Sequence, residues 1–318
     1  MTASLPQDVQ QVFDRFITTE YTTIDGRGQP ITWPVTPYYS PGAVTVDVTT
    51  GLGYPKKAND AAANPHVALL FSDPTGSGVE SPPMVLVQGT ATVDDRDLDA
   101  NRERYARESV EKLPAIKDKL PPKAIQRALG WYFTRIYVKV RPERVWVWRE
   151  GPESEPELLD AHLEEVRSGH DEEPDADVAP PRERGPVWDE RIDQLGSRYD
   201  TAVVSLVAPD GFPFSARVRV TVDRGAQRIH LDEVPTGAPL QPGLACLAAH
   251  EHEENFKWQR NFQVRGDLVE DDRGWAIVPA KLIGGLEVPE GQVAMLKENF
   301  RKSLRFRKVA KRELAKRG

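Results

Sequence analysis

Short runs of alternating apolar and polar residues recur along the chain and predict β-strands. Clear examples read VTVDVTT, VLVQGTATV and SARVRV, and glycine, proline or aspartate residues stand near their ends. A period of two is typical of strands with one buried face, and the flanking residues are typical of turns. Many short strands joined by turns favour a small antiparallel barrel. We therefore predict a mainly β protein.

An internal repeat organises the chain. Pro65 and Pro242 begin two similar apolar runs and are 177 residues apart, and Gly89 and Gly266 in the following runs show the same offset. Equal offsets in separate segments indicate two copies of one domain. We expect the apolar runs after Pro65 and Pro242 to be equivalent strands of two barrels.

Two further pairs of segments extend the repeat. The turn at 28–30 parallels the turn at 211–213, and each leads into a half-buried strand. Pro142 parallels Pro279 with an offset of 137, so the first copy carries about 40 extra residues. This insertion, at 94–135, has helical spacing and a double-proline helix start. The second copy has the short turn EDDRG in its place.

These observations set the domain boundaries that we expect. The acidic residues and prolines after position 150 indicate a solvated linker, in which LLDAHLEEVRSG after Glu157 is compatible with a short helix and 171–186 is loosely held. The basic C-terminal segment predicts a helix that is solvated or packed on a barrel, with an anionic contact as the alternative. The predicted parts are a first barrel with an N-terminal helix at 1–150, the linker at 151–188, a smaller second barrel at 189–290 and the C-terminal helix at 291–318.

Composition narrows the classes of function. The net charge of −7 argues against a general nucleic-acid partner, and no apolar run reaches the length of a membrane span. The N-terminus lacks the basic and apolar regions of a secretory signal, so we expect a cytoplasmic protein. Cys246, the single cysteine, lies in an apolar run and is expected to be buried. It can form neither an intrachain disulfide nor a multi-cysteine metal site.

The most specific local signal follows the strand VTVDVTT. A glycine turn there leads to Lys56 and Lys57 and then to a short helical stretch. Two ammonium groups beside backbone N–H groups at the start of a helix form a suitable phosphate site. Paired lysines at a turn are more often simply solvated, so from the residues alone both interpretations stay open.

The residues around these lysines resemble the FMN-binding split-barrel family of the pyridoxamine 5'-phosphate oxidase type, which includes flavin- and deazaflavin-dependent oxidoreductases. In that family a Ser-Arg-Lys-Ala-like turn stands eight residues before an Asn-Pro-x-Val strand start, and its lysine binds the cofactor phosphate. Here Lys57 stands eight residues before Pro65, Ala58 follows it, and 64–67 supply the strand start.

The resemblance continues outside this turn. It includes the hairpin DGRGQP, Gln88 with the glycine after it, and the segment RPER at 141–144. It spans most of 10–150 and, more faintly, 190–290. It implies two tandem split β-barrels with peripheral helices that form a pseudo-dimer.

The resemblance also implies one FMN or deazaflavin site, in or next to the first barrel. Lys57 would bind the phosphate, and Lys56 replaces the arginine of the family. The alternative for Trp33 is core packing, for Gln88 an outward strand position, and for Arg217 a solvated strand face. The cofactor-binding residues that we predict are Lys57, Lys56, Thr32, Trp33, Pro34, Val35, Thr49, Thr50, Gln88 and Arg217.

The second copy departs from this pattern. It reads VPTGAPLQPG where the lysines would stand, so an equivalent second phosphate site is not expected. His250 and His252 lie on one face of a predicted strand, as some metal or haem sites require, or they form a polar strand end at the domain interface. We predict no metal site.

The expected function follows from the resemblance. We expect a flavin-type oxidoreductase that transfers hydride or electrons to a small organic substrate, with no single indispensable acid or base. The alternative is a non-catalytic module that holds a cofactor or haem. Nucleophile elbow, Walker, Rossmann and HExxH motifs are absent from the sequence. We expect neither a nucleic-acid nor a membrane partner, and either a monomeric pseudo-dimer or a homodimer.

Overall fold

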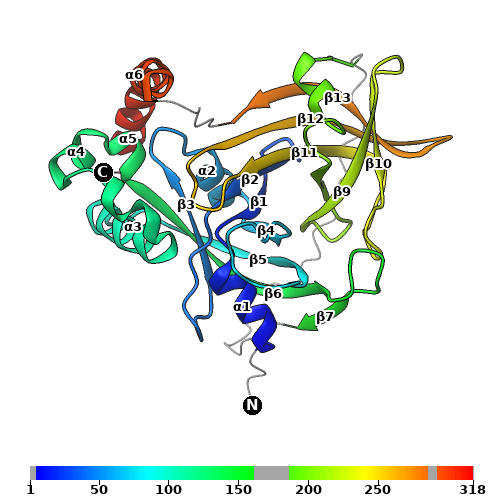
Figure 1. Ribbon diagram of the computed structural model, residues 1–318, viewed down its shortest axis with the longest axis horizontal. Helices are drawn as coiled ribbons and strands as arrows, with labels where there is room; N and C mark the ends of the chain where they lie inside the picture. The colour runs from blue at the N-terminus through cyan, green and yellow to red at the C-terminus, as the bar shows by residue number, and fades with distance from the viewer. Residues whose placement is uncertain (1–4, 161–185, 286–291, 318) are drawn as a thin grey trace.

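The computed structural model describes residues 5–160, 186–285 and 292–317, and at 118, 119, 160 and 292–302 it describes the backbone alone. Two β-sheets make up most of it, and most of the helices gather beside the first sheet (Figure 1). The first sheet has the order β2-β1-β4-β5-β6-β3, with β7 beside β6. Its strands are β1 (Thr19–Ile24), β2 (Pro30–Val35), β3 (Val46–Gly51), β4 (His66–Phe71), β5 (Met84–Asp94), β6 (Arg135–Trp148) and β7 (Glu157–Asp160).

The second sheet closes into a barrel with the order β10-β13-β12-β11-β8-β9. Each of its strands takes the place of a strand in the first sheet, β8 for β1 through β13 for β6. The apolar runs after Pro65 and Pro242 are the equivalent strands β4 and β11, so the prediction of two tandem barrels is confirmed. The strands are β8 (Thr201–Val207), β9 (Pro213–Asp223), β10 (Arg228–Asp232), β11 (Gly243–His252), β12 (Gln259–Asp271) and β13 (Gly274–Gly284).

A β-bulge occupies the same place in both barrels. Gly89 pairs with Pro142 and Gly266 pairs with Pro279, and the strand register shifts directly before each glycine. A Cβ atom on Gly89 would lie 2.2 Å from a carbonyl oxygen of the opposite strand, and one on Gly266 would lie 2.1 Å away. Side chains are therefore excluded at both positions, and the bulge tolerates a proline that lacks an N–H.

The two barrels differ in how they close. In the second barrel β9 pairs with β10 and completes the ring. In the first, β2 and β3 are the two ends of the sheet; beyond β2, Tyr38 exchanges two backbone hydrogen bonds with Asp47 of β3, at 2.7 and 2.8 Å. Pro34 and Pro37 have no N–H to donate, which prevents a continuous ladder along this edge. The first barrel is therefore a curled sheet with a split side.

The barrels pack through their equivalent strands. β2 contacts β8, β11 and β12, and β9 in return contacts β1, β4 and β5. This reciprocity is the pattern of a two-fold interface between like domains. Leu70, Leu86 and Trp148 of the first barrel belong to the core of the second. The interface is therefore an apolar core shared by both domains, as a pseudo-dimer requires.

Four hydroxyl groups meet inside this interface. Thr22 and Thr32 are opposite each other on β1 and β2, and Ser205 and Ser215 are opposite each other on β8 and β9. Their Oγ atoms form a closed ring with separations of 2.9, 2.6, 2.8 and 2.9 Å. All four side chains are buried. In a ring, each hydroxyl can donate one hydrogen bond and accept another, so no polar atom is left unpaired.

Helices cover the first barrel. α1 (Gln7–Arg15) turns Val9, Val12 and Phe13 into the first core. The insertion expected at 94–135 contains α3 (Leu98–Lys112), a 3₁₀ turn (Pro114–Lys119), α4 (Lys123–Ala128) and α5 (Gly130–Phe133). α2 (Lys56–Ala63) follows β3, a 3₁₀ turn (Glu190–Gln194) precedes β8, and α6 (Gln292–Arg317) ends the described chain beside α5 (Figure 1). Within the described ranges, every helix is too short or too polar to cross a bilayer.

Part of the expected linker is a strand. Glu157–Asp160 pairs with residues 144–147 of β6, so the expectation of a helix after Glu157 is wrong for these residues. The edge of β6 beyond its pairing with β3 offers free backbone groups, and β7 covers them. The rest of that segment and nearly all of 171–186 lie outside the described residues.

Candidate functional site

The turn between β3 and α2 approaches the neighbouring helices closely. Gly53 donates its N–H to the carbonyl oxygen of Trp131 at 2.8 Å, and a Cβ on Gly53 would lie 2.8 Å from Cβ of Phe306 on α6. A Cβ on Gly51 would lie 2.9 Å from the ring of Tyr54. The two glycines therefore let the turn pack against α5 and α6, and this packing fixes the start of α2.

The two predicted lysines differ in their partners. Lys56 is exposed and forms ion pairs with Asp60 at 2.8 Å and with Asp25 at 3.7 Å. Lys57 is partly buried and lies above the ring of Tyr54, with Nζ 5.7 Å from the ring centroid. Burial lowers the pKa of Lys57 to about 8, and the nearby charge of Arg135 acts in the same direction. Lys56 is thus neutralised, and Lys57 is a cation without a carboxylate partner among the described residues.

A second cation lies behind the same tyrosine. Arg135, the first residue of β6, is 6% exposed, and its guanidinium donates to the hydroxyls of Tyr54 at 2.9 Å and Tyr105 at 2.7 Å. It also lies over the rings of Tyr105 and Tyr132, 4.0 and 4.4 Å from their centroids. Its Nε atom is buried without a hydrogen-bond partner. Within the described residues this guanidinium has no carboxylate at ion-pair distance.

The positive charge of Arg135 changes the pKa of the tyrosine hydroxyl beside it. Burial alone raises the pKa of Tyr105, but the Arg135 guanidinium and the hydrogen bonds to Tyr105 outweigh it, so the pKa of Tyr105 falls below its ordinary value. No side chain caps the first turn of α2, so the backbone N–H groups at its start add a partial positive charge. Lys57, Arg135 and the helix start together favour an anion at this turn.

Two residues predicted at the cofactor ring lie inside the barrel interface instead. The Thr32 hydroxyl belongs to the ring of four hydroxyls, and its carbonyl oxygen accepts a hydrogen bond from Gln263 at 3.1 Å. The Gln88 amide donates to the carbonyl oxygen of Pro213 at 3.0 Å and accepts the indole N–H of Trp146 at 3.0 Å. Both side chains are buried and bind the two barrels together. Sequence reasoning could not foresee this, because it depends on which strands meet across the interface.

The remaining predicted residues lie nearer the split side of the first barrel. Thr50 is buried and its hydroxyl donates to the carbonyl oxygen of Tyr54 at 2.8 Å, which holds the turn before α2. Thr49 on β3 is half-buried, as are Trp33, Pro34 and Val35 on β2. Val35 packs against the first core.

Arg217 lies in a different place, at the seam between the barrels. It donates to Glu20 of β1 at 2.7 Å, to Ser72 at 2.9 Å and to Thr201 at 3.0 Å. Burial acts to raise the pKa of Glu20, but Arg217 and His250 more than offset it, and the pKa of Glu20 falls below its ordinary value. Arg217 therefore has a buried carboxylate partner of its own. It does not belong to a solvated strand face.

His250 and His252 adjoin Arg217. Nε2 of His250 lies 2.6 Å from the Glu20 carboxylate, and Nε2 of His252 lies 2.9 Å from the hydroxyl of Thr18. Both rings also lie close to Asp73, at 3.8 and 3.6 Å. No group of three or more side chains arranged to hold a metal ion occurs in the described part of the chain. These contacts favour the polar strand end at the interface over a ligand pair.

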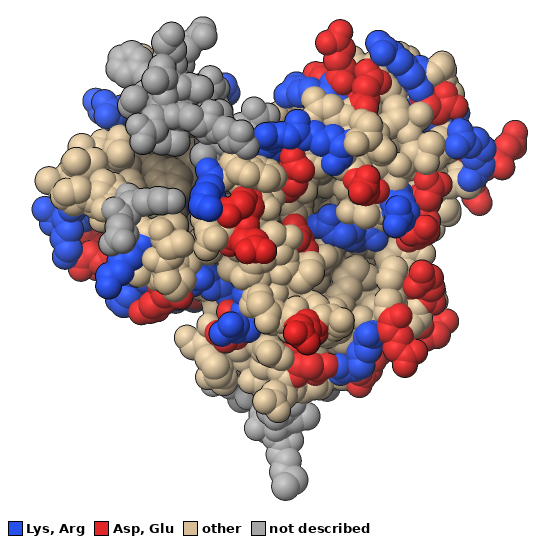
Figure 2. All heavy atoms as spheres, viewed as in Figure 1, with Lys and Arg blue, Asp and Glu red and all other residues tan. Residues whose placement is uncertain are grey.

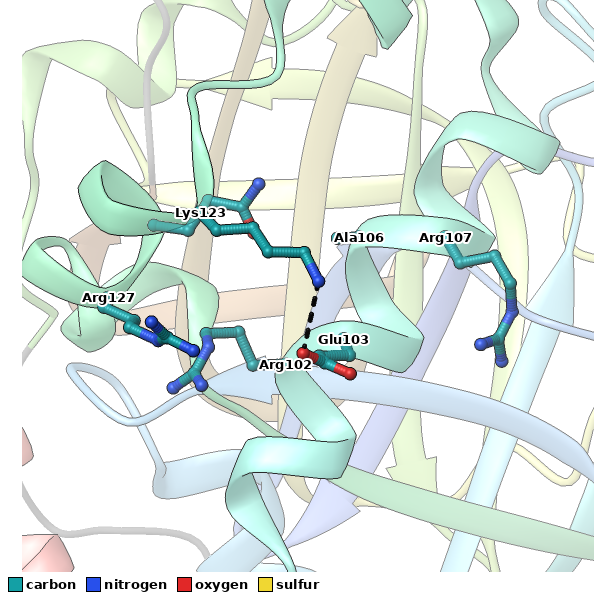
Figure 3. A pocket seen from close by; sticks show the side chains of 7 residues that line it. Arg102, Glu103, Ala106, Arg107, Lys123 and Arg127 are labelled. Carbon is teal, nitrogen blue, oxygen red and sulfur yellow. Dashed lines mark hydrogen bonds and ion pairs between the residues drawn. The ribbon is translucent and has the colours of Figure 1, made fainter.

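The described residues form at least two pockets, and neither of these two is lined by Lys57. A seam pocket of about 340 Å³ lies between the barrels and is lined by residues that include Asp73, Arg217 and His250. A groove of about 380 Å³ lies between α3 and α4, where Lys123 points toward Glu103, and Arg102 and Arg127 also line it (Figure 3). Three of its four cations have carboxylate partners, namely Arg102 with Asp99, Arg107 with Glu111 and Lys123 with Glu103.

Other candidates for chemistry are inert. Cys246 is fully buried, as predicted, and burial raises the pKa of its thiol to about 11, so it is no nucleophile at neutral pH. On the face of the molecule shown in Figure 2, acidic and basic side chains are interspersed. Among the described residues, the turn with Lys57 and Arg135 and the seam pocket are two places where buried charged groups lie together.

Comparison with known proteins bears on the fold of the chain and not on its ligand or activity. No family model and no curated protein matches the chain. Solved structures match about half of it. A structure described as a pyridoxamine 5'-phosphate oxidase from Listeria innocua is 15% identical over 45% of this chain and 98% of its own, with a TM-score of 0.33. An F420 reductase is 19% identical over 44% and 98%, with a TM-score of 0.33. HutZ, the haem storage protein of Vibrio cholerae, is 16% identical over 45% and 94%, with a TM-score of 0.33.

These matches carry no argument about ligand or activity, because the identities and TM-scores are low. The assignment of two tandem barrels, the first with a split side and the second closed, depends on the strand order and the paired bulges. Sequence reasoning did not identify Arg135 or Glu20. Arg135 had a weak signal, since it follows the aromatic run WYFT directly before an apolar strand. Glu20 had none, because its partners come from the other barrel.

Proposed function

We propose that the chain binds one phosphate-bearing cofactor of the flavin type, FMN or a deazaflavin, with its phosphate at Lys57. The bound cofactor transfers hydride or electrons to a small organic substrate. The observation that carries this proposal is the pair of cations at the β3–α2 turn. Lys57 and Arg135 both contact Tyr54, 5.7 and 5.9 Å from its ring centroid, and neither has a carboxylate partner among the described residues.

The residues at the turn fit a phosphate. Lys57 loses hydration in its partly buried place and is repelled by the nearby charge of Arg135, so the protein alone does not stabilise the charge of Lys57. An anion placed against Lys57 would offset both costs. The Lys57 ammonium and the free N–H groups of the first turn of α2 are the donors that phosphate oxygens accept. Arg135 lies behind Tyr54 and adds long-range attraction.

The sequence resemblance supports the proposal independently of these charges. Lys57, Ala58 and the strand start at 64–67 match the family turn whose lysine binds the cofactor phosphate. The cofactor, once bound, supplies the redox chemistry. The chain holds the phosphate and sets access to the cofactor. Thr32 and Gln88 have no part in this proposal, because their polar groups bind within the interface.

Titration of FMN and of a deazaflavin cofactor into the wild type and two lysine variants tests this proposal. Lys57→Ala removes a charge-assisted contact worth about 1.5–3 kcal/mol, so affinity should fall roughly tenfold to hundredfold. Lys56→Ala is the matched control, because an exposed lysine already paired with Asp60 gives at most a small, salt-screened attraction. We expect less than about a threefold loss for it.

The outcomes separate the two functional readings. If Lys57→Ala binds as tightly as the wild type, or if both lysine variants lose affinity equally, the phosphate assignment is wrong. A wild type that binds a cofactor but transfers no electrons to any acceptor would favour the alternative, a non-catalytic binding module. Absorbance of the titrated flavin under a reductant distinguishes these cases in the same sample.

A further inference from the structure

The seam pocket has walls from both barrels. Ser72, Asp73 and Thr75, after β4, form one side, and Arg217 and His250, on β9 and β11, form the other. β4 and β11 are equivalent strands, so the pocket lies where their ends meet, on the pseudo-twofold axis. It is separate from the turn with Lys57, and its volume of about 340 Å³ is large enough for a small organic molecule.

The arginines of the seam pocket are already neutralised. Arg217 pairs with the fully buried Glu20 at 2.7 Å, and Arg198 pairs with Glu251 at 3.0 Å. Asp73 accepts a hydrogen bond from the Thr75 N–H at 3.1 Å. No lysine or arginine among the described residues lies within ion-pair distance of Asp73. Asp73 therefore has no direct ion pair with a lysine or arginine among the described residues, although the charge of Arg217 acts on it through space.

The carboxylate of Asp73 is ionised. Burial acts to raise its pKa, but the hydrogen bond from Thr75 and the charges of Arg217 and the two histidines outweigh burial, and the pKa of Asp73 falls below its ordinary value. Burial lowers the pKa of His252. His252 is therefore neutral at pH 7, and it leaves the negative charge of Asp73 in place.

His250 turns an unused nitrogen toward this carboxylate. Its Nε2 lies 2.6 Å from the Glu20 carboxylate and 2.9 Å from Nη2 of Arg217. Because Nη2 of Arg217 itself donates to Glu20 at 2.7 Å, the short contact between Nε2 and Glu20 is satisfied when Nε2 carries the hydrogen. Nδ1 is buried, has no hydrogen-bond partner and lies 3.8 Å from a carboxylate oxygen of Asp73. With its hydrogen on Nε2, the ring leaves Nδ1 as an acceptor, and a donor placed between Nδ1 and the Asp73 carboxylate can form a hydrogen bond to each.

We propose that the seam pocket binds a small organic amine, whose primary ammonium group donates to Nδ1 of His250 and to the carboxylate of Asp73. Because the two acceptors are 3.8 Å apart, a nitrogen at about 2.9 Å from both satisfies normal hydrogen-bond geometry. The described residues contain no group of side chains suited to a metal ion. An ammonium group supplies both a positive charge in direct contact with Asp73 and the N–H donors that the two acceptors need.

The test uses the full chain with ¹⁵N-labelled histidine. Methylammonium, butylammonium and tetramethylammonium chloride are titrated separately at constant ionic strength, and the Nδ1 resonance of His250 is followed by NMR. Methylammonium and butylammonium should shift this resonance saturably. Tetramethylammonium carries the same charge without an N–H, so it should leave the resonance in place.

Two variants locate the site. Asp73→Asn keeps an oxygen that can accept the Thr75 N–H, so the loop should hold, and the apparent amine affinity should fall at least about tenfold. Asp272→Asn, in the exposed turn between β12 and β13, should bind as the wild type does. His250→Gln, checked for folding by thermal melting, should also bind at least tenfold more weakly by calorimetry.

The proposal is overturned by any of three results. The first is that neither methylammonium nor butylammonium shifts the His250 resonance. The second is that tetramethylammonium shifts it as strongly as methylammonium does. The third is that Asp73→Asn binds butylammonium with wild-type affinity. None of these measurements involves FMN, a deazaflavin or Lys57. The seam pocket and the proposed cofactor site therefore succeed or fail separately.

Discussion

The corresponding turns of the two barrels have different uses. In the first barrel, the turn between β3 and α2 presents Lys57 in front of Arg135 and begins a helix whose first turn has no side-chain cap. In the second barrel, residues 233–242 form no helix and contain no lysine. There Thr236 donates its N–H to the carbonyl oxygen of Pro152 at 3.0 Å and accepts the indole N–H of Trp148 at 3.1 Å.

The comparison shows that the turn at one position of the fold can either expose polar groups or hold a neighbouring segment of the chain. The second turn holds the chain that leaves β6, and so it fastens the start of the linker to the second barrel. The first turn is packed by α5 and α6 through glycines and aromatic rings, so its polar groups remain available to a ligand. The same position in the fold thus holds a cation without a carboxylate partner among the described residues in one copy, and fastens the chain after β6 in the other.

The strongest test of the shared plan concerns the two bulges. Gly89→Ala and Gly266→Ala each place a Cβ within 2.2 Å of a backbone oxygen, which no side-chain rotation can relieve. We expect each substitution to lower the free energy of unfolding by roughly 2–4 kcal/mol. Urea denaturation monitored by tryptophan fluorescence measures both effects.

Gly26→Ala is the control for these variants. Gly26 lies in a hairpin turn with nothing within 4 Å of its Cβ position, so its effect on unfolding should stay within about 0.5 kcal/mol. If one of the two bulge glycines tolerated alanine as well as Gly26 does, the two barrels would not share the bulge, and their equivalence would fail at that strand.

A smaller expected effect is the pH dependence of phosphate affinity, which arises from Lys57 in the first barrel and has no counterpart in the second. Below the Lys57 pKa of about 8, which burial and Arg135 set, the lysine is already charged and phosphate affinity should be constant. A bound phosphate raises this pKa, so above about pH 8 binding takes up a proton and affinity falls by up to about tenfold per pH unit. FMN titrations between about pH 7 and 9.5 in wild type and Lys57→Ala measure the slope. A flat wild-type profile, or an equal slope in the variant, would contradict the account.

Local sequence signals predicted the fold better than the site. The offsets of Gly89 with Gly266 and of Pro142 with Pro279 mark a bulge that depends on neighbours within one hairpin, so it leaves a pattern in the chain. The start of α2 at Lys56 is likewise determined by residues close to it in the sequence. These features could be predicted because the residues that cause them are close in sequence or paired within one sheet.

The contacts that could not be predicted from the sequence are made between segments far apart in the chain. Gln88 was predicted either to bind the cofactor or to point outward from its strand, and its amide donates instead to the carbonyl oxygen of Pro213 in the other barrel. Arg135 receives its environment from Tyr54, Tyr105 and Tyr132, which come from three separate elements. The segment after Glu157 was compatible with a short helix, but Glu157–Asp160 pairs with the free edge of β6 as a strand. No local pattern encodes these pairings.

The central claim is that two barrels of one plan hold one phosphate-binding turn. Isothermal titration of the full chain with the cofactor that binds more tightly, FMN or a deazaflavin, measures the number of sites directly. The account predicts one site per chain in the wild type, and in Lys57→Ala the same single site with affinity reduced about tenfold to hundredfold. Two equivalent sites per chain, or one site with unchanged affinity in Lys57→Ala, would contradict it.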